Sequence, residues 1–244
     1  MLKLLRIELL KIRRSLALLM LVAIPLVVVV FNVLVLTHRG NLAALRAEQV
    51  GGFWMSLVAL WAFFMLPLFV ALTTGLLNGQ EHRNQSWRLM LTLPLSARRL
   101  YLAKLLLAWA FAAAGSGLLL LMGALALLGL SAFGLDVRSM WDTPLLTIWG
   151  QLALGCLPVV AIQHAIAWRV ANLVAPLATA VLATMMITQV ASSRYWVWLP
   201  WDYALMAVAG RKTGAPEFAM VLAACTGIAA ITLGCFALAR RVRA

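Results

Sequence analysis

Charged side chains are scarce in this chain of 244 residues, and acids are the scarcest of them. Asp, Glu, Lys and Arg make up 11% of the residues, hydrophobic residues make up 65%, and the mean hydropathy is +1.00. A soluble domain is about a quarter charged and about half apolar. The composition therefore excludes an ordinary soluble domain and indicates an integral membrane protein.

Cysteine and histidine are also rare, with three of each. The cysteines lie inside apolar runs without a C-x-x-C pair, which argues against a disulfide framework or a cysteine zinc site. The histidines fall in an expected outer loop, an inner loop and a span, so they cannot share one metal ion. We expect no metal site from these six residues, which are Cys156, Cys225, Cys235, His38, His82 and His164.

Motifs for hydrolytic chemistry are missing as well. No H-E-x-x-H motif occurs, and the fragment GRKT at 210–213 lacks the glycine that a phosphate-binding loop needs five residues before Gly210. An intramembrane protease with Ser116 and His164 is the remaining enzyme hypothesis. At about 1.5 Å per residue, these two differ in expected depth by about 10–15 Å, which is beyond hydrogen-bond reach. We predict that the chain is not itself an enzyme and binds no cofactor.

Long apolar runs are what the sequence has in abundance. A helix needs roughly 20 apolar residues to cross about 30 Å of hydrocarbon. Six runs are long enough, so we predict an all-α membrane protein with six transmembrane helices in one domain over 1–244. The predicted spans are 15–36, 53–77, 101–130, 145–168, 173–191 and 217–239.

The distribution of cations predicts the orientation. With the N-terminus in the cytoplasm, six of the 20 Lys and Arg residues fall outside and the other 14 fall inside. This asymmetry follows the positive-inside rule and places both termini in the cytoplasm. Basic residues that flank spans also account for the net charge of +13, so we expect no nucleic-acid partner.

Residues 1–14 have the pattern of an amphipathic helix. Leu2, Leu5, Leu9 and Ile12 recur at helical spacing, and the basic residues of this segment lie elsewhere on the helical wheel. We predict an elbow helix along the inner membrane face. In an alternative that is compatible with the first, the cations only orient the first span.

An aromatic segment at 194–212 lies between the last two predicted spans. Proline and charge break it too often for a span, but residues 203–209 are too apolar for a loop in water. Aromatic side chains prefer the membrane interface. We predict a short interfacial or re-entrant helix on the outer side, near Tyr195, Trp196, Trp198, Trp201 and Tyr203.

Polar side chains within spans need a hydrogen-bond partner in the bilayer. Asn32, Thr73, Gln163 and Gln189 are candidates for lining a substrate path. Alternatively, they hold neighbouring helices together through hydrogen bonds.

The inner loop at 78–100 is the longest polar break in the chain. Residues 81–93 can form a short helix with a polar face, and Pro94 ends it because the residue before a proline avoids the helical region. Ser96 can cap a second helix that enters the third span. The candidate contact residues for a partner in this loop are Glu81, Arg83, Asn84, Trp87 and Arg88.

This loop resembles that of ABC-2 type transporter permeases, in which an acid and a base precede a run ending in T-x-P-x-S-R and a lysine in the next helix. The chain departs from that pattern at Gln85, Ser86 and Ala97. Its size is similar to that of permease subunits of lantibiotic-immunity exporters. The match is carried by Glu81, Arg83, Leu91, Thr92, Leu93, Pro94, Ser96, Arg98 and Lys104.

The resemblance implies a permease subunit in a bacterial cytoplasmic (inner) membrane. The loop would contain a coupling helix that binds a separate ATP-binding subunit, present in two copies, with ATP and Mg held by that partner. A second permease, either another copy or a related subunit, would complete the path for export of an amphipathic, peptide or lipid-like substrate. The alternative function is a non-transporting membrane sensor or assembly protein on the same scaffold.

Overall fold

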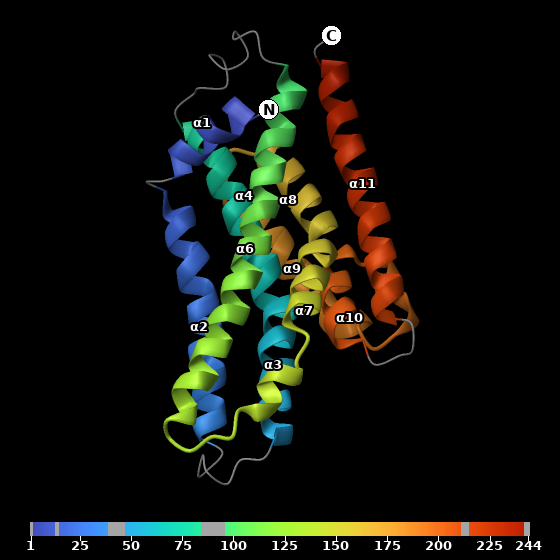
Figure 1. Cartoon of the computed structure of the whole chain (residues 1–244). Coiled ribbons are helices and arrows are strands. Elements are labelled where there is room, and N and C mark those ends of the chain that lie inside the picture. The colour runs from blue at the N-terminus through green and yellow to red at the C-terminus, as the bar shows by residue number, and fades with distance from the viewer. Residues whose placement is uncertain (1, 13–14, 39–46, 84–95, 211–214, 242–244) are drawn as a thin grey trace.

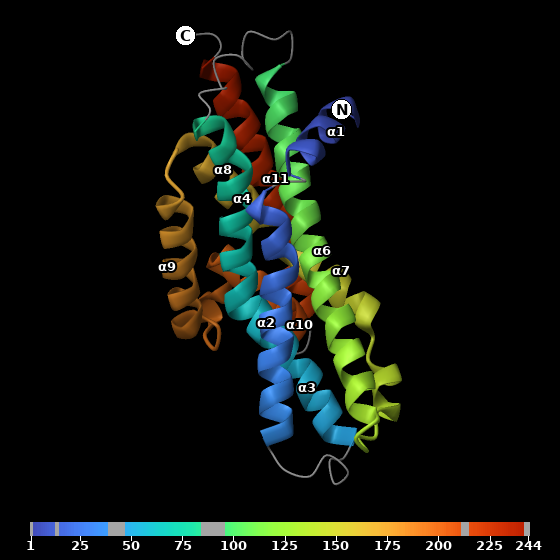
Figure 2. The ribbon, with the colours of Figure 1, turned by 90° about the vertical axis from the view of Figure 1, so that its left-hand side faces the viewer.

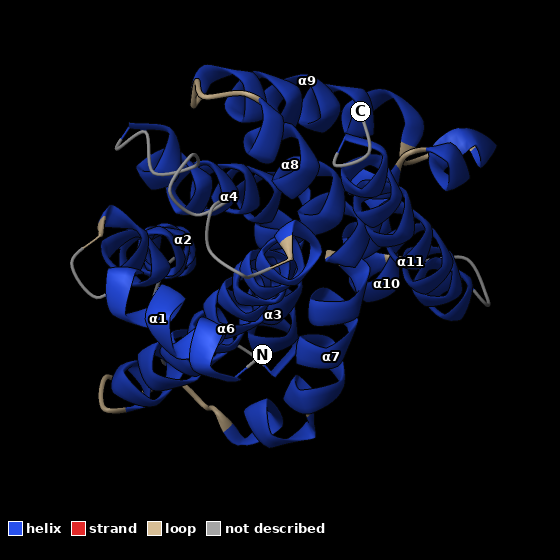
Figure 3. Cartoon of the chain, turned by 90° about the horizontal axis from the view of Figure 1, so that it is seen from above, coloured by secondary structure: helices blue, strands red, loops and turns tan. Residues whose placement is uncertain are grey.

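The structure is a computed structural model that describes residues 2–12, 15–38, 47–83, 96–210 and 215–241. Within these ranges the chain consists of helices joined by turns and contains no strand, so the all-α prediction is confirmed for them (Figures 1 and 3). The helices are α1 (Leu2–Ile12), α2 (Leu16–His38), α3 (Ala47–Leu60), η2 (Trp61–Met65), α4 (Leu66–Arg83), α6 (Ala97–Ser131), η3 (Arg138–Asp142), α7 (Leu145–Gly155), α8 (Leu157–Arg169), α9 (Val174–Val190), η4 (Arg194–Trp198), η5 (Pro200–Asp202), α10 (Tyr203–Ala209) and α11 (Ala215–Arg241).

Five helical stretches are long and apolar enough to cross a membrane. They are Leu16–His38, Val50–Gly79, Ala97–Ser131, Leu145–Arg169 and Ala215–Leu238. The chain is therefore a multi-pass membrane protein. The run at 173–191 forms α9, which has 17 residues and is about 26 Å long at about 1.5 Å per residue. That is less than the hydrocarbon thickness of about 30 Å, so helix length alone supports five spans rather than six.

Helices α4, α6 and α8 pack at the centre of the bundle, and α2, α7, α9 and α11 surround them (Figure 3). Large apolar side chains such as Trp61, Phe69 and Leu119 are fully buried there. In contrast, only 22% of the span in α2 and 11% of the span in α11 is buried. In a membrane protein, such apolar helix faces are available for contact with lipid or with another membrane subunit.

Two of the long stretches contain a break at a proline. Pro67 has no N–H to donate to the carbonyl of Phe63, and the chain forms the π-helix η2 at this level, in which the Leu66 N–H reaches back to the carbonyl of Trp61. The second break separates α7 from α8 at Cys156, two residues before Pro158. At each break the side chains of the following helical segment are rotated about the helix axis relative to those of the preceding segment.

The polar loop predicted at 78–100 is shorter in the structure, because its two ends belong to long helices. Residues 78–83 continue α4, and α6 begins at Ala97. The Asn78 side chain bonds to the carbonyl of Thr74 in the same helix, which suits continued helix rather than a break. Ser96 occupies the N-cap position of α6, but its hydroxyl makes no capping hydrogen bond, so the predicted cap is wrong in that respect.

The aromatic segment between α9 and α11 folds as three short helices, namely η4, η5 and α10. Helix α10 packs on α7 so closely that a Cβ on Gly155 would lie 2.7 Å from the Cα of Ala204. It lies level with α7 and the end of α9, while α2, α3 and α6 extend farther in the same direction (Figures 1 and 2). The segment is therefore folded against the bundle.

Candidate functional site

The predicted partner-binding residues are only partly described. Glu81 and Arg83 lie in the last turn of α4, so their backbone continues the helix that crosses the bundle. Asn84, Trp87 and Arg88, and with them most of the predicted helix at 81–93, lie outside the described residues. The described geometry therefore concerns the two helices from which this segment emerges, α4 and α6.

A buried ion pair joins α1 to those two helices. The Lys104 ammonium of α6 donates to Glu8 Oε2 of α1 at 2.6 Å and to the carbonyl of Leu77 in α4 at 3.0 Å. Lys11 donates to the other oxygen, Glu8 Oε1, at 2.7 Å. Glu8 is 2% exposed and Lys104 is 1% exposed. One lysine thus ties three helices together at the base of the 84–95 segment.

The protonation state of Glu8 follows from these contacts. Burial acts to raise the pKa of the carboxyl group, but the charges and hydrogen bonds of Lys104 and Lys11 outweigh burial, and the net pKa is lowered. Glu8 is therefore ionised at neutral pH. A buried charge that is paired and hydrogen-bonded is tolerated, whereas removal of one partner leaves an uncompensated charge.

A second set of polar contacts lies beside this ion pair and reaches α8. Asn78 Nδ2 is 3.2 Å from His164 Nδ1, and both residues are fully buried. The His164 ring also packs on Tyr101 of α6, with ring centroids 4.5 Å apart, and on Trp168 at 5.8 Å. We call Glu8, Leu77, Asn78, Lys104 and His164 the inner junction. It connects α1, α4, α6 and α8.

Sequence reasoning missed the acid of the inner junction. It assigned no role to Glu8, but among the described residues this acid of α1 pairs with Lys104 of α6. One signal was present, because Glu8 is the single acid among residues 1–14 and lies four residues before Ile12. Ile12 is 3% exposed, whereas Leu9 is 52% exposed, so α1 turns Glu8 rather than Leu9 toward the bundle.

The four candidate path residues lie on four different helices, and no hydrogen bond joins any two of them among the described residues. Asn32 donates to the carbonyl of Val28 at 2.9 Å, and Thr73 donates to the carbonyl of Phe69 at 2.8 Å, each within its own helix. These bonds do not link helices. Gln189 is exposed on α9, and its amide lies 3.3 Å from the Thr188 hydroxyl.

Gln163 differs from the other three because it is fully buried and neither atom of its amide has a hydrogen-bond partner among the described residues. A buried polar group without a partner costs free energy, so this site suits a water molecule or a polar ligand group.

Ser116 and His164 do not form a catalytic pair. The Ser116 hydroxyl donates to the carbonyl of Ala112 at 2.9 Å and accepts from the Trp61 indole N–H at 3.0 Å. His164 instead contacts Asn78. The Ser116 hydroxyl therefore holds the π-helix η2 against α6. The residues that the structure describes also contain no group of three or more His, Cys, Asp or Glu side chains that could hold a metal ion.

A buried acid, Asp202, lies at the other end of the bundle. It is fully buried at the end of η5, and neither carboxylate oxygen has a hydrogen-bond partner among the described residues. Burial raises its pKa to about 7. Nearby, the Tyr203 hydroxyl donates to the carbonyl of Val197 at 2.6 Å and joins α10 to η4. Asp202 is thus a titratable group inside packed protein.

Comparison with known proteins agrees with this architecture. The family model described as ABC-2 family transporter protein matches residues 4–188, about three quarters of the chain, from α1 into α9. No curated protein and no solved structure matches the chain. A match of this extent, on a multi-pass helical bundle whose inner loop has the T-x-P-x-S pattern, shows that the chain belongs to the ABC-2 family of transporter proteins.

Proposed function

We propose that this chain is the permease subunit of an ATP-driven ABC exporter that moves an amphipathic, peptide or lipid-like substrate outward. Membership of the ABC-2 transporter family makes it the membrane component of an ABC transporter and implies an ABC ATP-binding subunit as its partner. In this proposal ATP and Mg bind only to the partner. This chain supplies the path and the coupling surface and carries out no chemistry of its own.

The observation that carries the coupling role is the double contact of Lys104. Its ammonium holds both the Glu8 carboxylate and the Leu77 carbonyl, so α1, α4 and α6 are fixed together at their shared end. A subunit that binds Glu81, Arg83, Asn84, Trp87 and Arg88 would press on the ends of α4 and α6. Packed helices respond to such a push as rigid bodies, so movement of the partner would reach the centre of the bundle.

We also propose six crossings, with α9 as the fifth. Helix α1 and the last turns of α11 lie at the same end of the bundle (Figure 1). A chain that begins and ends on one side of a membrane crosses it an even number of times. The five long stretches give an odd number, and α9 runs along the bundle between α8 and η4 (Figure 2). If α9 is counted as a crossing, the number of crossings is six, which is even.

The positive-inside rule then places the inner junction and both termini in the cytoplasm. We assign the chain to the bacterial cytoplasmic (inner) membrane. The working transporter would contain two ATP-binding subunits and a second permease, either another copy of this chain or a related subunit.

The test is reconstitution with candidate ABC ATP-binding subunits from the same organism. ATP hydrolysis in vesicles is measured for the wild type and for a variant with Glu81, Arg83 and Arg88 replaced by Ala. We expect the complex to hydrolyse ATP and the variant to lose assembly or stimulation. Unchanged assembly and ATP turnover in the variant would contradict the coupling role. A complex that assembles and moves no amphipathic substrate would favour a sensor or assembly protein.

A further inference from the structure

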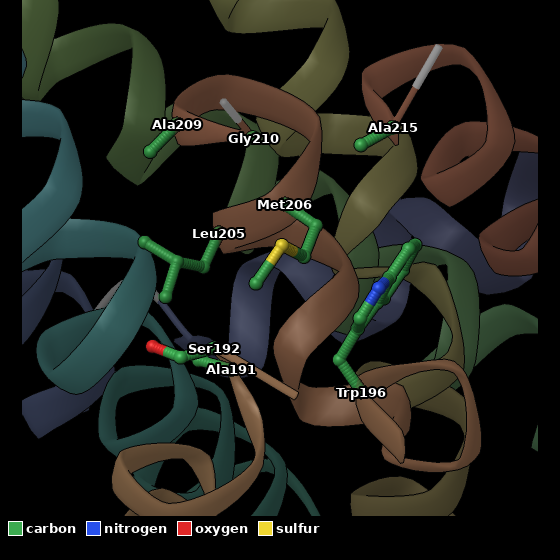
Figure 4. A pocket seen from close by; sticks show the side chains of 8 residues that line it. All are labelled: Ala191, Ser192, Trp196, Leu205, Met206, Ala209, Gly210 and Ala215. Atoms are coloured by element: carbon green, nitrogen blue, oxygen red, sulfur yellow. The ribbon is translucent and has the colours of Figure 1, made fainter. Parts of the chain in front are cut away.

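A cavity of about 310 Å³ lies where α9, η4, α10 and α11 meet, and Figure 4 shows the side chains that line it. Its size is at the lower end of the range of about 300–1,000 Å³ for small-molecule sites. That volume suits one hydrocarbon chain or one side group of a ligand rather than a whole peptide. The lining residues are Ala191, Ser192, Trp196, Leu205, Met206, Ala209, Gly210 and Ala215.

The wall formed by Trp196 is held firmly in place. Its ring is 7% exposed and packs edge-on against Tyr203 and Phe218, with ring centroids 6.3 Å and 6.1 Å away. Tyr203 is fixed in turn by its bond to the carbonyl of Val197. Met206 lies between Leu205 and Trp196 (Figure 4) and brings an adaptable thioether. The cavity therefore has one rigid aromatic wall and one wall that can adjust to a ligand.

The lining is suited to hydrocarbon. None of the eight lining side chains carries a charge, and five of the lining residues are alanine, glycine or serine. Water in a buried site needs two to four polar partners, and this lining offers few. An apolar chain would instead gain roughly 25 cal/mol for each Å² of surface that leaves water.

The surroundings indicate that the ligand comes from the bilayer. The helices on either side, α9 and α11, expose apolar side chains such as Leu182, Met185, Phe218 and Val221, each at least half exposed. In a membrane protein these surfaces face lipid. The cavity therefore lies by the end of α9 and the start of α11, beside apolar helix surfaces that acyl chains of the bilayer contact.

A cation lies next to the cavity. Arg194 is exposed, and its guanidinium carbon is 5.2 Å from the centre of the Tyr195 ring. It is two residues from both Ser192 and Trp196, and consecutive Cα atoms are about 3.8 Å apart. Arg194 Nη2 donates to the Tyr195 hydroxyl at 3.2 Å, which leaves its other donors for a headgroup whose chain enters the cavity. Arginine is well suited to phosphate because its donors match that geometry.

We propose that this cavity binds one acyl chain of an anionic phospholipid, with the phosphate near Arg194. The site is independent of the coupling role proposed above, because none of its lining residues belongs to the inner junction or to the proposed partner-binding residues. It requires neither the ATP-binding subunit nor ATP.

The test is native mass spectrometry of the full chain in detergent with added dioleoyl phosphatidylglycerol or dioleoyl phosphatidylcholine. We expect the wild type to retain one phosphatidylglycerol. Ala209→Trp fills the cavity, and we expect retention to fall about tenfold or more, equivalent to about 1.4 kcal/mol of binding. Met186→Trp is the matched control, because it adds the same ring to an exposed position on α9 and should leave retention unchanged.

Two further variants make the result decisive. Ala191→Phe fills the cavity from α9 and replaces Ala209→Trp if that variant does not fold, as judged by its melting temperature. Arg194→Gln should remove the preference for phosphatidylglycerol over phosphatidylcholine. The lipid's acyl chain should still bind in the cavity of this variant. Retention equal to wild type in both filled variants would overturn the proposal. So would displacement of all bound lipid by an apolar peptide, because the site would then be a peptide site.

Discussion

At the scale of single residues, the contacts of Lys104 hold α1, α4 and α6 together at one end of the bundle. A lysine buried to 1% exposure is stable only because its charge is matched by Glu8 and its protons are accepted by the carboxylate and the Leu77 carbonyl. Neither residue is replaceable alone without leaving a buried charge. The pair should therefore behave as one unit in stability measurements.

We predict strong coupling between Glu8 and Lys104. Glu8→Gln and Lys104→Met should each lower the free energy of unfolding by about 3–5 kcal/mol, because each leaves the other charge buried without its partner. The double variant should lose less than the sum, with a coupling energy within the usual range of about 0.5–3 kcal/mol. Denaturant unfolding in detergent measures all four proteins. Additive losses would mean that the two side chains do not act as a pair.

Asp202 gives a prediction for pH. In the unfolded chain the carboxyl group loses its proton near its ordinary pKa of 3.8, whereas in the folded chain it keeps the proton to about 7. Unfolding therefore releases a proton between these values, and stability falls as the pH rises through this window, by up to about 1.4 kcal/mol per pH unit. Above about 7 the contribution is constant.

Asp202→Asn should remove the part of this dependence that Asp202 contributes, which the difference in melting temperature between the variant and the wild type, followed from pH 5.5 to 7, would measure. The window avoids interference from Glu8, whose pKa is lowered and whose stabilising effect is lost only at more acidic pH. A matched control is Asp136→Asn in the turn before η3, where the acid is exposed. If the asparagine variant at 202 keeps the slope of the wild type, the titrating group is a different one.

At the scale of elements, the close contact between α7 and α10 holds the aromatic segment in the bundle. A Cβ at position 155 would lie 2.7 Å from the Cα of Ala204, which is backbone and cannot rotate away. Gly150, on the same helix, has nothing within 4 Å of an added Cβ. The two glycines therefore make a matched pair that separates crowding from the general effect of losing a glycine.

We predict that Gly155→Leu destabilises the protein by about 1–3 kcal/mol, the usual cost of overpacking, and that Gly150→Leu does not. The measurement is thermal unfolding followed by tryptophan fluorescence. The crowded variant should also loosen η5 and α10 and increase the accessibility of Asp202. Equal melting temperatures for the two variants would show that α10 does not depend on this contact.

How much of this arrangement could be read from the sequence depends on the range of the interaction involved. The helices of the long apolar stretches were predictable because hydropathy is a local property. The pairing of Glu8 with Lys104 spans 96 residues, and no local pattern records which helices become neighbours. For the same reason the isolation of Asp202 was not foreseen, since burial by other elements cannot be seen in its own segment.

At the scale of the whole molecule, the position of α9 decides the topology. If α9 crosses the membrane, the end of α8 and the segment η4 lie on opposite sides. Val170 follows α8 and is 40% exposed, and Trp198 ends η4 and is 82% exposed. Single cysteines at these two positions would therefore report on the two faces of the membrane, in a background with Cys156, Cys225 and Cys235 replaced by alanine.

We predict that Trp198→Cys reacts with a membrane-impermeant maleimide in intact cells and that Val170→Cys reacts only after the membrane is opened. The reason is that 17 apolar residues reach about 26 Å, enough to cross if the bilayer thins slightly beside the bundle. The cysteine-free background is the control for nonspecific labelling. Labelling of both cysteines from the same side would mean that α9 turns back within the membrane, and α1 and the end of α11 would then lie on opposite sides.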